Sequence, residues 1–132
     1  MARTMNYHII TDKDLVEAIA VSGTAIIYTK ALRIPYGINF GISAKAASSG
    51  TIDLKVEIQQ SFKVPNPEGI ADAHWSTPTD ITSPIFSSIT SATIAQKALN
   101  VDPFVYCRFK ITGQGSNDTS TTLNIWVSMQ EE

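Results

Sequence analysis

Two stretches in the first half of the chain alternate between apolar and polar residues. They are YGINFGISAK, residues 36–45, and TIDLKVEIQQSF, residues 51–62. Successive side chains of a β-strand point to opposite faces, so each stretch predicts a strand with one buried face. The predicted buried sets are Tyr36, Ile38, Phe40, Ile42 and Ala44 in the first strand, and Ile52, Leu54, Val56, Ile58 and Phe62 in the second.

The segment AASSG, residues 46–50, separates these two stretches and predicts a hairpin loop. When the turn is centred on Ser48, Ile42 lies opposite Leu54. Both apolar faces then lie on the same side of the predicted hairpin, as a common core requires.

The C-terminal third repeats the pattern in FVYCRFKIT, residues 104–112, and TLNIWVSM, residues 122–129. The polar, glycine-containing loop between them predicts a second hairpin, centred near Asn117. The predicted buried sets are Val105, Cys107, Phe109 and Ile111, and then Leu123, Ile125, Val127 and Met129.

The remaining segments predict shorter strands. IFSSIT, residues 85–90, and ATIAQKAL, residues 92–99, are two of them, and residues 16–34 contain the others. Residues 1–14 are expected to form an extended arm, although Thr11-x-x-Asp14 resembles a capping box and leaves a short helix open. We therefore expect an all-β, antiparallel sandwich of seven to eight strands, of the plain or the jelly-roll type.

Composition narrows the possible functions. Hydrophobic residues make up 43% of the 132 residues, which suits a single domain over residues 1–132. The formal net charge is −2 and the ten basic residues are scattered, so no nucleic-acid surface is predicted. No apolar run approaches the length of about 18 residues that spans a membrane, and the N-terminus lacks a secretory apolar segment. We expect synthesis in the cytoplasm without a signal peptide.

No motif for catalysis, metal or cofactor binding is present, so the sequence predicts a non-enzymatic protein without a cofactor. The two histidines, His8 and His74, supply too few ligands for a zinc site. Cys107 lies in an apolar strand and is expected in the core. Asn117 begins an N-D-T sequon, but a turn explains it better. Carboxylates for glycoside hydrolysis are available at Glu57, Glu68, Asp72 and Asp80, and simpler surface roles are expected for them.

The candidate partner interface comprises Phe104, Tyr106, Arg108 and Trp126, which lie opposite the apolar sets of their strands. In the predicted hairpin Arg108 faces Trp126, an arrangement that would place a guanidinium over an indole. Aromatic residues and arginine on an outer face are enriched at interfaces. Three interpretations stay open, namely a partner interface, cover by another segment of the chain, and a sugar-binding platform.

Five segments of the chain form a pattern of strands and turns. They are SGTAIIYTKAL (22–32), SGTIDLKVEIQQSF (49–62), HWSTP (74–78), YCRFKITGQGSNDTSTT (106–122) and LNIWVSMQE (123–131). Together they resemble small β-sandwich virion structural proteins of tailed phages and prophages. The chain departs from that pattern after Ser61, where Phe62-Lys63-Val64-Pro65 replaces the usual Asp-Gly turn.

The resemblance implies a virion protein, either a capsid decoration or auxiliary protein or a tail-associated one. It implies protein–protein contacts with other copies of the chain, as a homo-oligomer, or with other virion proteins. A carbohydrate-binding or adhesin module, with Trp126, Tyr106 or Trp75 as a stacking platform, is the alternative from a different functional class.

Overall fold

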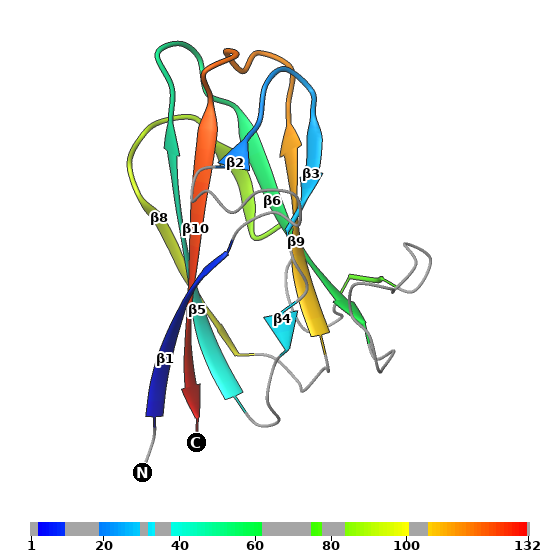
Figure 1. The fold of residues 1–132 in the computed structure, drawn as a ribbon, viewed down its shortest axis with the longest axis vertical. Helices are drawn as coiled ribbons and strands as arrows, with labels where there is room; N and C mark the ends of the chain where they lie inside the picture. Colours follow the sequence, from blue (N-terminus) through cyan, green and yellow to red (C-terminus); the bar gives the residue numbers. More distant parts are fainter. Residues whose placement is uncertain are drawn as a thin grey trace.

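The protein is described here by a computed structural model that covers residues 3–9, 19–29, 32–33, 38–61, 75–77, 84–100 and 106–131. In strands at residues 3–9, 32–33, 38–40, 99–100 and 128–131 only the backbone is described. All regular structure in these parts of the chain is β-strand, arranged in two antiparallel sheets (Figure 1). The predicted all-β sandwich is confirmed.

The first sheet has the strand order β1-β10-β5-β8. Its strands are β1 (Arg3–Ile9), β10 (Thr122–Glu131), β5 (Ile38–Ala47) and β8 (Ala95–Asn100). The short strand β2 (Ile19–Ala20) pairs with β10 beyond the end of β1, so β1 and β2 together flank β10. Residues 3–9 of the predicted arm thus form a strand of this sheet, and the helix considered for residues 11–18 lies outside the described residues.

The second sheet has the strand order β3-β9-β6-β7. Its strands are β3 (Ile26–Tyr28), β9 (Tyr106–Gly113), β6 (Leu54–Ser61) and β7 (Phe86–Ile89). Strand β4 (Leu32–Arg33) pairs with β9 beyond the end of β3.

The strand order is that of a jelly roll. When β1 and β2 are counted as one strand position, and β3 and β4 as another, the described chain has eight positions. The first pairs with the last, the second with the seventh, the third with the sixth and the fourth with the fifth. This nested pairing across two facing sheets defines the jelly-roll arrangement.

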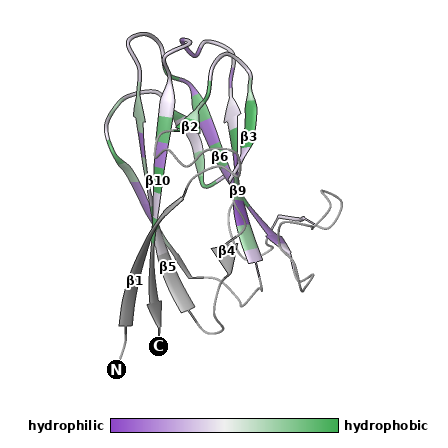
Figure 2. Cartoon of the chain, viewed as in Figure 1, coloured by the Kyte–Doolittle hydropathy of each residue, from purple (hydrophilic) through white to green (hydrophobic). Residues whose placement is uncertain are grey.

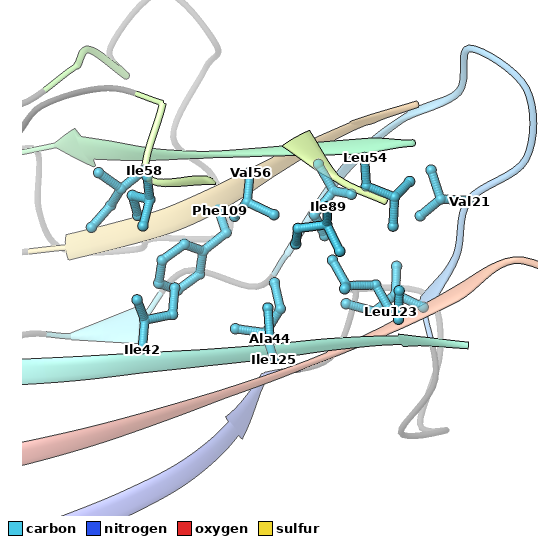
Figure 3. Close-up of a cluster of buried hydrophobic side chains, with 14 of the residues drawn as sticks. Val21, Ile42, Ala44, Leu54, Val56, Ile58, Ile89, Phe109, Leu123 and Ile125 are labelled. Carbon is cyan, nitrogen blue, oxygen red and sulfur yellow. The ribbon is translucent and has the colours of Figure 1, made fainter. Parts of the chain in front are cut away.

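Both predicted hairpins are wrong. Strand β5 pairs with β10 and β8, whereas β6 pairs with β9 and β7, so the loop between β5 and β6 crosses from one sheet to the other. Strands β9 and β10 likewise belong to different sheets. Ile42 therefore pairs with Val127, and Leu54 pairs with Gly113. Figure 3 shows Ile42 and Leu54 on facing sheets, with the core between them.

The predicted burial of the alternating residues is confirmed wherever the side chains are described. Phe109 and Ile58 from the second sheet point toward Ile42 and Ile125 from the first (Figure 3). Figure 2 shows the resulting change between apolar and polar residues along the strands. Complete burial of each large apolar side chain contributes about 1.5–3 kcal/mol, so this layer holds the two sheets together. The core comprises Ile19, Val21, Ile42, Ala44, Ala46, Ile52, Leu54, Val56, Ile58, Ile85, Ile89, Cys107, Phe109, Ile111, Leu123, Ile125 and Val127.

At one end of the sandwich Asn117 joins three loops. Its side-chain amide Nδ2 donates to the carbonyl oxygens of Gly23 at 3.0 Å and of Asp53 at 2.7 Å. Gly23 adopts a φ of 55°, a left-handed conformation that favours glycine, at the point where the chain passes from the first sheet to the second. Asn117 is only 8% exposed, so its amide nitrogen is engaged within the fold. This supports the turn interpretation of the N-D-T sequence over glycosylation.

Candidate interaction surface

Arg108 lies on the outer face of the second sheet, between two aromatic rings. Its Cζ atom is 4.1 Å from the centroid of the Tyr28 ring and 4.6 Å from that of the Trp75 ring. Its Nε donates a hydrogen bond of 2.7 Å to Oε1 of Gln59, the residue opposite Arg108 on β6. A guanidinium is planar and weakly hydrated, so it can stack on aromatic rings and keep a hydrogen bond in the same plane. We call these four residues the Arg108 stack.

The backbone of β6 positions Trp75 in the stack. Gln60 donates from its N–H to the carbonyl oxygen of Ser76 at 2.7 Å, and Ser76 donates to the carbonyl oxygen of Gln60 at 3.0 Å. This isolated bridge fixes residues 75–77 along the edge of β6. Trp75 is 8% exposed, so its ring belongs to the packed structure and offers little surface to a ligand.

The structure places Trp126 in a different sheet from Tyr106 and Arg108, which share β9. Tyr106 is buried, and Arg108 is covered by the stack, which matches the interpretation that other segments of the chain cover this face. The predicted contact between Arg108 and Trp126 is wrong, because β9 and β10 lie in different sheets and the two side chains are on opposite outer faces. Phe104 lies outside the described residues. The sequence carried no signal for the partners of Arg108, since Tyr28 and Trp75 are remote from it in the chain.

Trp126 lies on the outer face of the first sheet and is 36% exposed. Ser43 on β5 is directly opposite it, and Gln96 on β8 is opposite Ser43, so small and polar residues extend outward from the indole. Of the exposed side chains described on this face, only Lys45 is charged. We call this surface the Trp126 face; its exposed residues are Ala20, Lys45, Ala47, Gln96, Ala98 and Trp126.

The outer face of the second sheet has a different character. Lys55, Glu57 and Lys110 lie on it, and the Lys55 Nζ is 3.6 Å from Oε1 of Glu57. Lys110 is opposite Glu57 in the strand register. These charged neighbours give Glu57 a surface ion-pairing role, and the other carboxylates considered for hydrolysis lie outside the described residues. The described side chains of the two outer faces therefore differ: those of the second sheet include several charged residues, and the exposed ones of the first sheet include only Lys45.

Cys107 is completely buried, and this burial raises the pKa of its thiol. Within the described ranges, His, Cys, Asp and Glu side chains form no group of three or more that could hold a metal ion. The part of the chain with assigned structure contains no helix long and apolar enough to cross a membrane. His74 lies outside the described residues, and His8 lies on β1 in register with Trp126.

Comparisons with family models, with curated proteins and with solved structures give no match.

Proposed function

We propose that this protein is a phage-type virion structural protein, a capsid decoration or auxiliary protein that acts through protein–protein contacts and without catalysis. The observation that carries the proposal is the Trp126 face, where an aromatic side chain stands among small, mostly uncharged neighbours. Jelly-roll sandwiches with broad flat faces suit such assembly, and they occur both in capsids and in lectins.

Energetics favour a protein occupant for this face. A neighbouring protein that packs on it would have to desolvate only one charged side chain, Lys45, among the exposed residues. Alanines at positions 20, 47 and 98 allow close approach of a partner surface. Trp126 then supplies the kind of aromatic anchor that concentrates binding energy at protein interfaces. Repetition of the contact around a particle would add avidity to weak individual contacts.

The direct experiment is to ask whether the protein is present in particles. Nuclease-resistant particles are purified by density gradient from a culture that carries the gene, and the protein is detected with an antibody raised against the purified chain. We expect it to sediment with the particles in many copies per particle. Its absence from particles that contain the other virion proteins would overturn the proposal.

The Trp126 face can be tested in the purified protein. Trp126→Ser removes the anchor, whereas Ile94→Ser removes an apolar side chain that is 48% exposed and precedes β8. We expect Trp126→Ser to weaken the apparent affinity for particles, or for other copies of the chain, by tenfold or more. The weaker self-association would appear in light scattering as a lower mass. Ile94→Ser should leave the affinity and the mass unchanged. Equal effects of the two substitutions would point to general hydrophobic association.

A carbohydrate-binding or adhesin module is the second candidate, because an exposed indole on a flat sheet also suits the apolar face of a sugar ring. Ser43, beside Trp126, and Gln96, one strand further along the same face, could hydrogen-bond hydroxyl groups of a sugar. Retention on a polysaccharide column that Trp126→Ala abolishes and Ile94→Ser preserves would favour this candidate. A survey of immobilised glycans without any bound sugar would remove it.

A further inference from the structure

We infer that β1 is an exchangeable strand, which one copy of this chain inserts beside β10 of a neighbouring copy. The inference rests on the proposed assembly function and specifies one of its contacts. It follows from how the four edges of the two sheets are treated, and from the length of chain between β1 and β2.

Three of the four sheet edges are poorly suited to pairing with another chain. On β8 the charged residue Lys97 lies opposite the buried Ile42, and an inward-facing lysine on an edge strand discourages further pairing. The pairing of β7 with β6 contains a register shift between Leu54 and Val56, and such irregularities also disrupt edges. The other edge of the second sheet, beside β9, is split into two short strands, β3 and β4.

The remaining edge belongs to the first sheet, where β1 lies beside β10, and it is long and regular. Strand β10 pairs with β1 over seven consecutive residue pairs, from Arg3 with Glu131 to Ile9 with Ile125. Among the described elements, β1 is hydrogen-bonded only to β10. Without β1, the backbone groups of β10 along this ladder would be unpaired, and such an edge is a ready template for a strand from another chain.

The connection after β1 is longer than pairing along β10 requires. Ile9 and Ile19 pair with Ile125 and Leu123, which a single residue separates on β10. In the connection from β1 to β2, by contrast, nine residues, 10–18, separate Ile9 from Ile19. Nine residues can span up to about 30 Å, several times the roughly 7 Å that two residues cover along β10. β2 can therefore stay on its own β10 while β1 reaches a neighbour.

The position of β1 allows this exchange without unfolding the sandwich. Figure 1 shows the start of β1 beside the end of β10, where β1, β10 and β5 diverge from β9 of the other sheet. As an edge strand paired with β10 alone among the described strands, β1 can leave without breaking another described strand pairing. Since the same seven pairs form within one chain or between two, exchange loses no backbone pairing, and this is the condition under which domain swapping is inexpensive. Particle assembly would then supply the bias toward the exchanged form.

Two single-cysteine variants test the inference. Asn6 and Ser128 are partners in the β1–β10 register, and Gly41 is the partner of Ser128 on β5, which lies inside the sheet. Differently tagged Asn6→Cys and Ser128→Cys chains are co-expressed, and the folded protein is treated with a short bifunctional thiol reagent. The matched control is a mixture of Gly41→Cys and Ser128→Cys chains. Cys107 stays in place, because it is completely buried.

We expect a cross-linked heterodimer from the first mixture, at least tenfold more abundant than from the control. Asn6→Pro, which removes a backbone donor from β1, should reduce the oligomer mass, whereas Asn6→Ala should not. No heterodimer above the control, in a protein that is oligomeric or particle-bound, would overturn strand exchange and leave the virion proposal intact. A protein that is monomeric, uncross-linked and absent from particles would overturn both.

Discussion

Asn117 and Asp53 exchange two hydrogen bonds across the end of the sandwich. The Asp53 N–H donates to Oδ1 of Asn117 at 2.6 Å, and Nδ2 of Asn117 donates to the Asp53 carbonyl oxygen at 2.7 Å. The side-chain amide of Asn117 thus bonds to both the N–H and the carbonyl group of Asp53, as the backbone of a neighbouring β-strand does. Because Nδ2 also reaches the Gly23 carbonyl oxygen, one side chain connects loops from both sheets.

Asn117→Ala should destabilise the protein by about 1–3 kcal/mol, because it leaves the Asp53 N–H without its acceptor. It also removes one of the two hydrogen bonds that the carbonyl oxygens of Asp53 and Gly23 each accept, the other coming from the backbone N–H of Gln114 or Gly115. Asn117→Asp should be worse at neutral pH, since a carboxylate would face two carbonyl oxygens. Ser116→Ala, at the exposed neighbouring position, should stay within about 0.5 kcal/mol of the unsubstituted protein. Urea denaturation measures all three, and equal stability of the alanine variants at positions 116 and 117 would contradict this role.

The sequence predicted which residues face the core but not which strands pair. Alternation places Ile42 and Leu54 on inner faces, and this holds whether they are neighbours in one hairpin or face each other across two sheets. The choice between these arrangements depends on remote strands, since Ile42 pairs with Val127 and Leu54 with Gly113. The loop AASSG also lacks the Asn-Gly or Asp-Gly pair that marks a tight hairpin.

The candidate surface was predictable to a similar extent. Alternation placed Arg108 and Trp126 on outer faces, as the structure does, but pairing them required the incorrect hairpin. The rings that contact Arg108 come from β3 and from residues 75–77, which no local pattern brings together. Trp126 shares its face with residues from β2, β5 and β8, and only the tertiary arrangement brings these strands together.

Arg108→Lys should loosen residues 75–77, because an ammonium group lacks the plane that stacks between Tyr28 and Trp75. We expect a loss of about 1–2 kcal/mol and a red shift of Trp75 fluorescence. The emission is measured with Trp126 replaced by Phe, since the chain has two tryptophans. Lys110→Met, two residues along the same strand, is the control and should leave the emission unchanged. An unshifted spectrum in Arg108→Lys would show that the stack does not hold Trp75.

Cys107 should resist thiol reagents in the folded protein. It is completely buried, so a reagent cannot reach the sulfur. Desolvation also raises the pKa of the thiol, which disfavours the reactive thiolate. We expect labelling by a chromogenic disulfide to be on the order of a thousandfold slower than in denaturant, or slower still, because it requires opening of the core. A Ser43→Cys variant supplies a thiol on the outer face as a positive control. Comparable rates at the two positions would show that the core opens readily.

Asp118 should make the loop at residues 117–121 sensitive to acid. Hydrogen bonds from the side chain and then the backbone of Ser120 lower the pKa of the Asp118 carboxyl from its ordinary value of 3.8. A carboxyl with a lowered pKa in the folded state stabilises the fold above its ordinary pKa, and this contribution is lost as the pH falls through the lowered value. The difference in stability between the unsubstituted protein and Asp118→Asn should therefore be largest near neutral pH and vanish in strong acid.

The contribution of Ser120 separates this effect from general acid unfolding. Ser120→Ala removes the hydroxyl that donates to Oδ2 of Asp118 but keeps the backbone donor, which lies 2.9 Å from the same oxygen. NMR titration of the Asp118 carboxyl should show its pKa moving upward in Ser120→Ala, toward 3.8. Ser49→Ala should move it less, because the Ser49 hydroxyl is 3.4 Å from Oδ2 and makes a weaker bond. A pKa that responds equally to both substitutions, or to neither, would mean that Ser120 does not determine the ionisation of this loop.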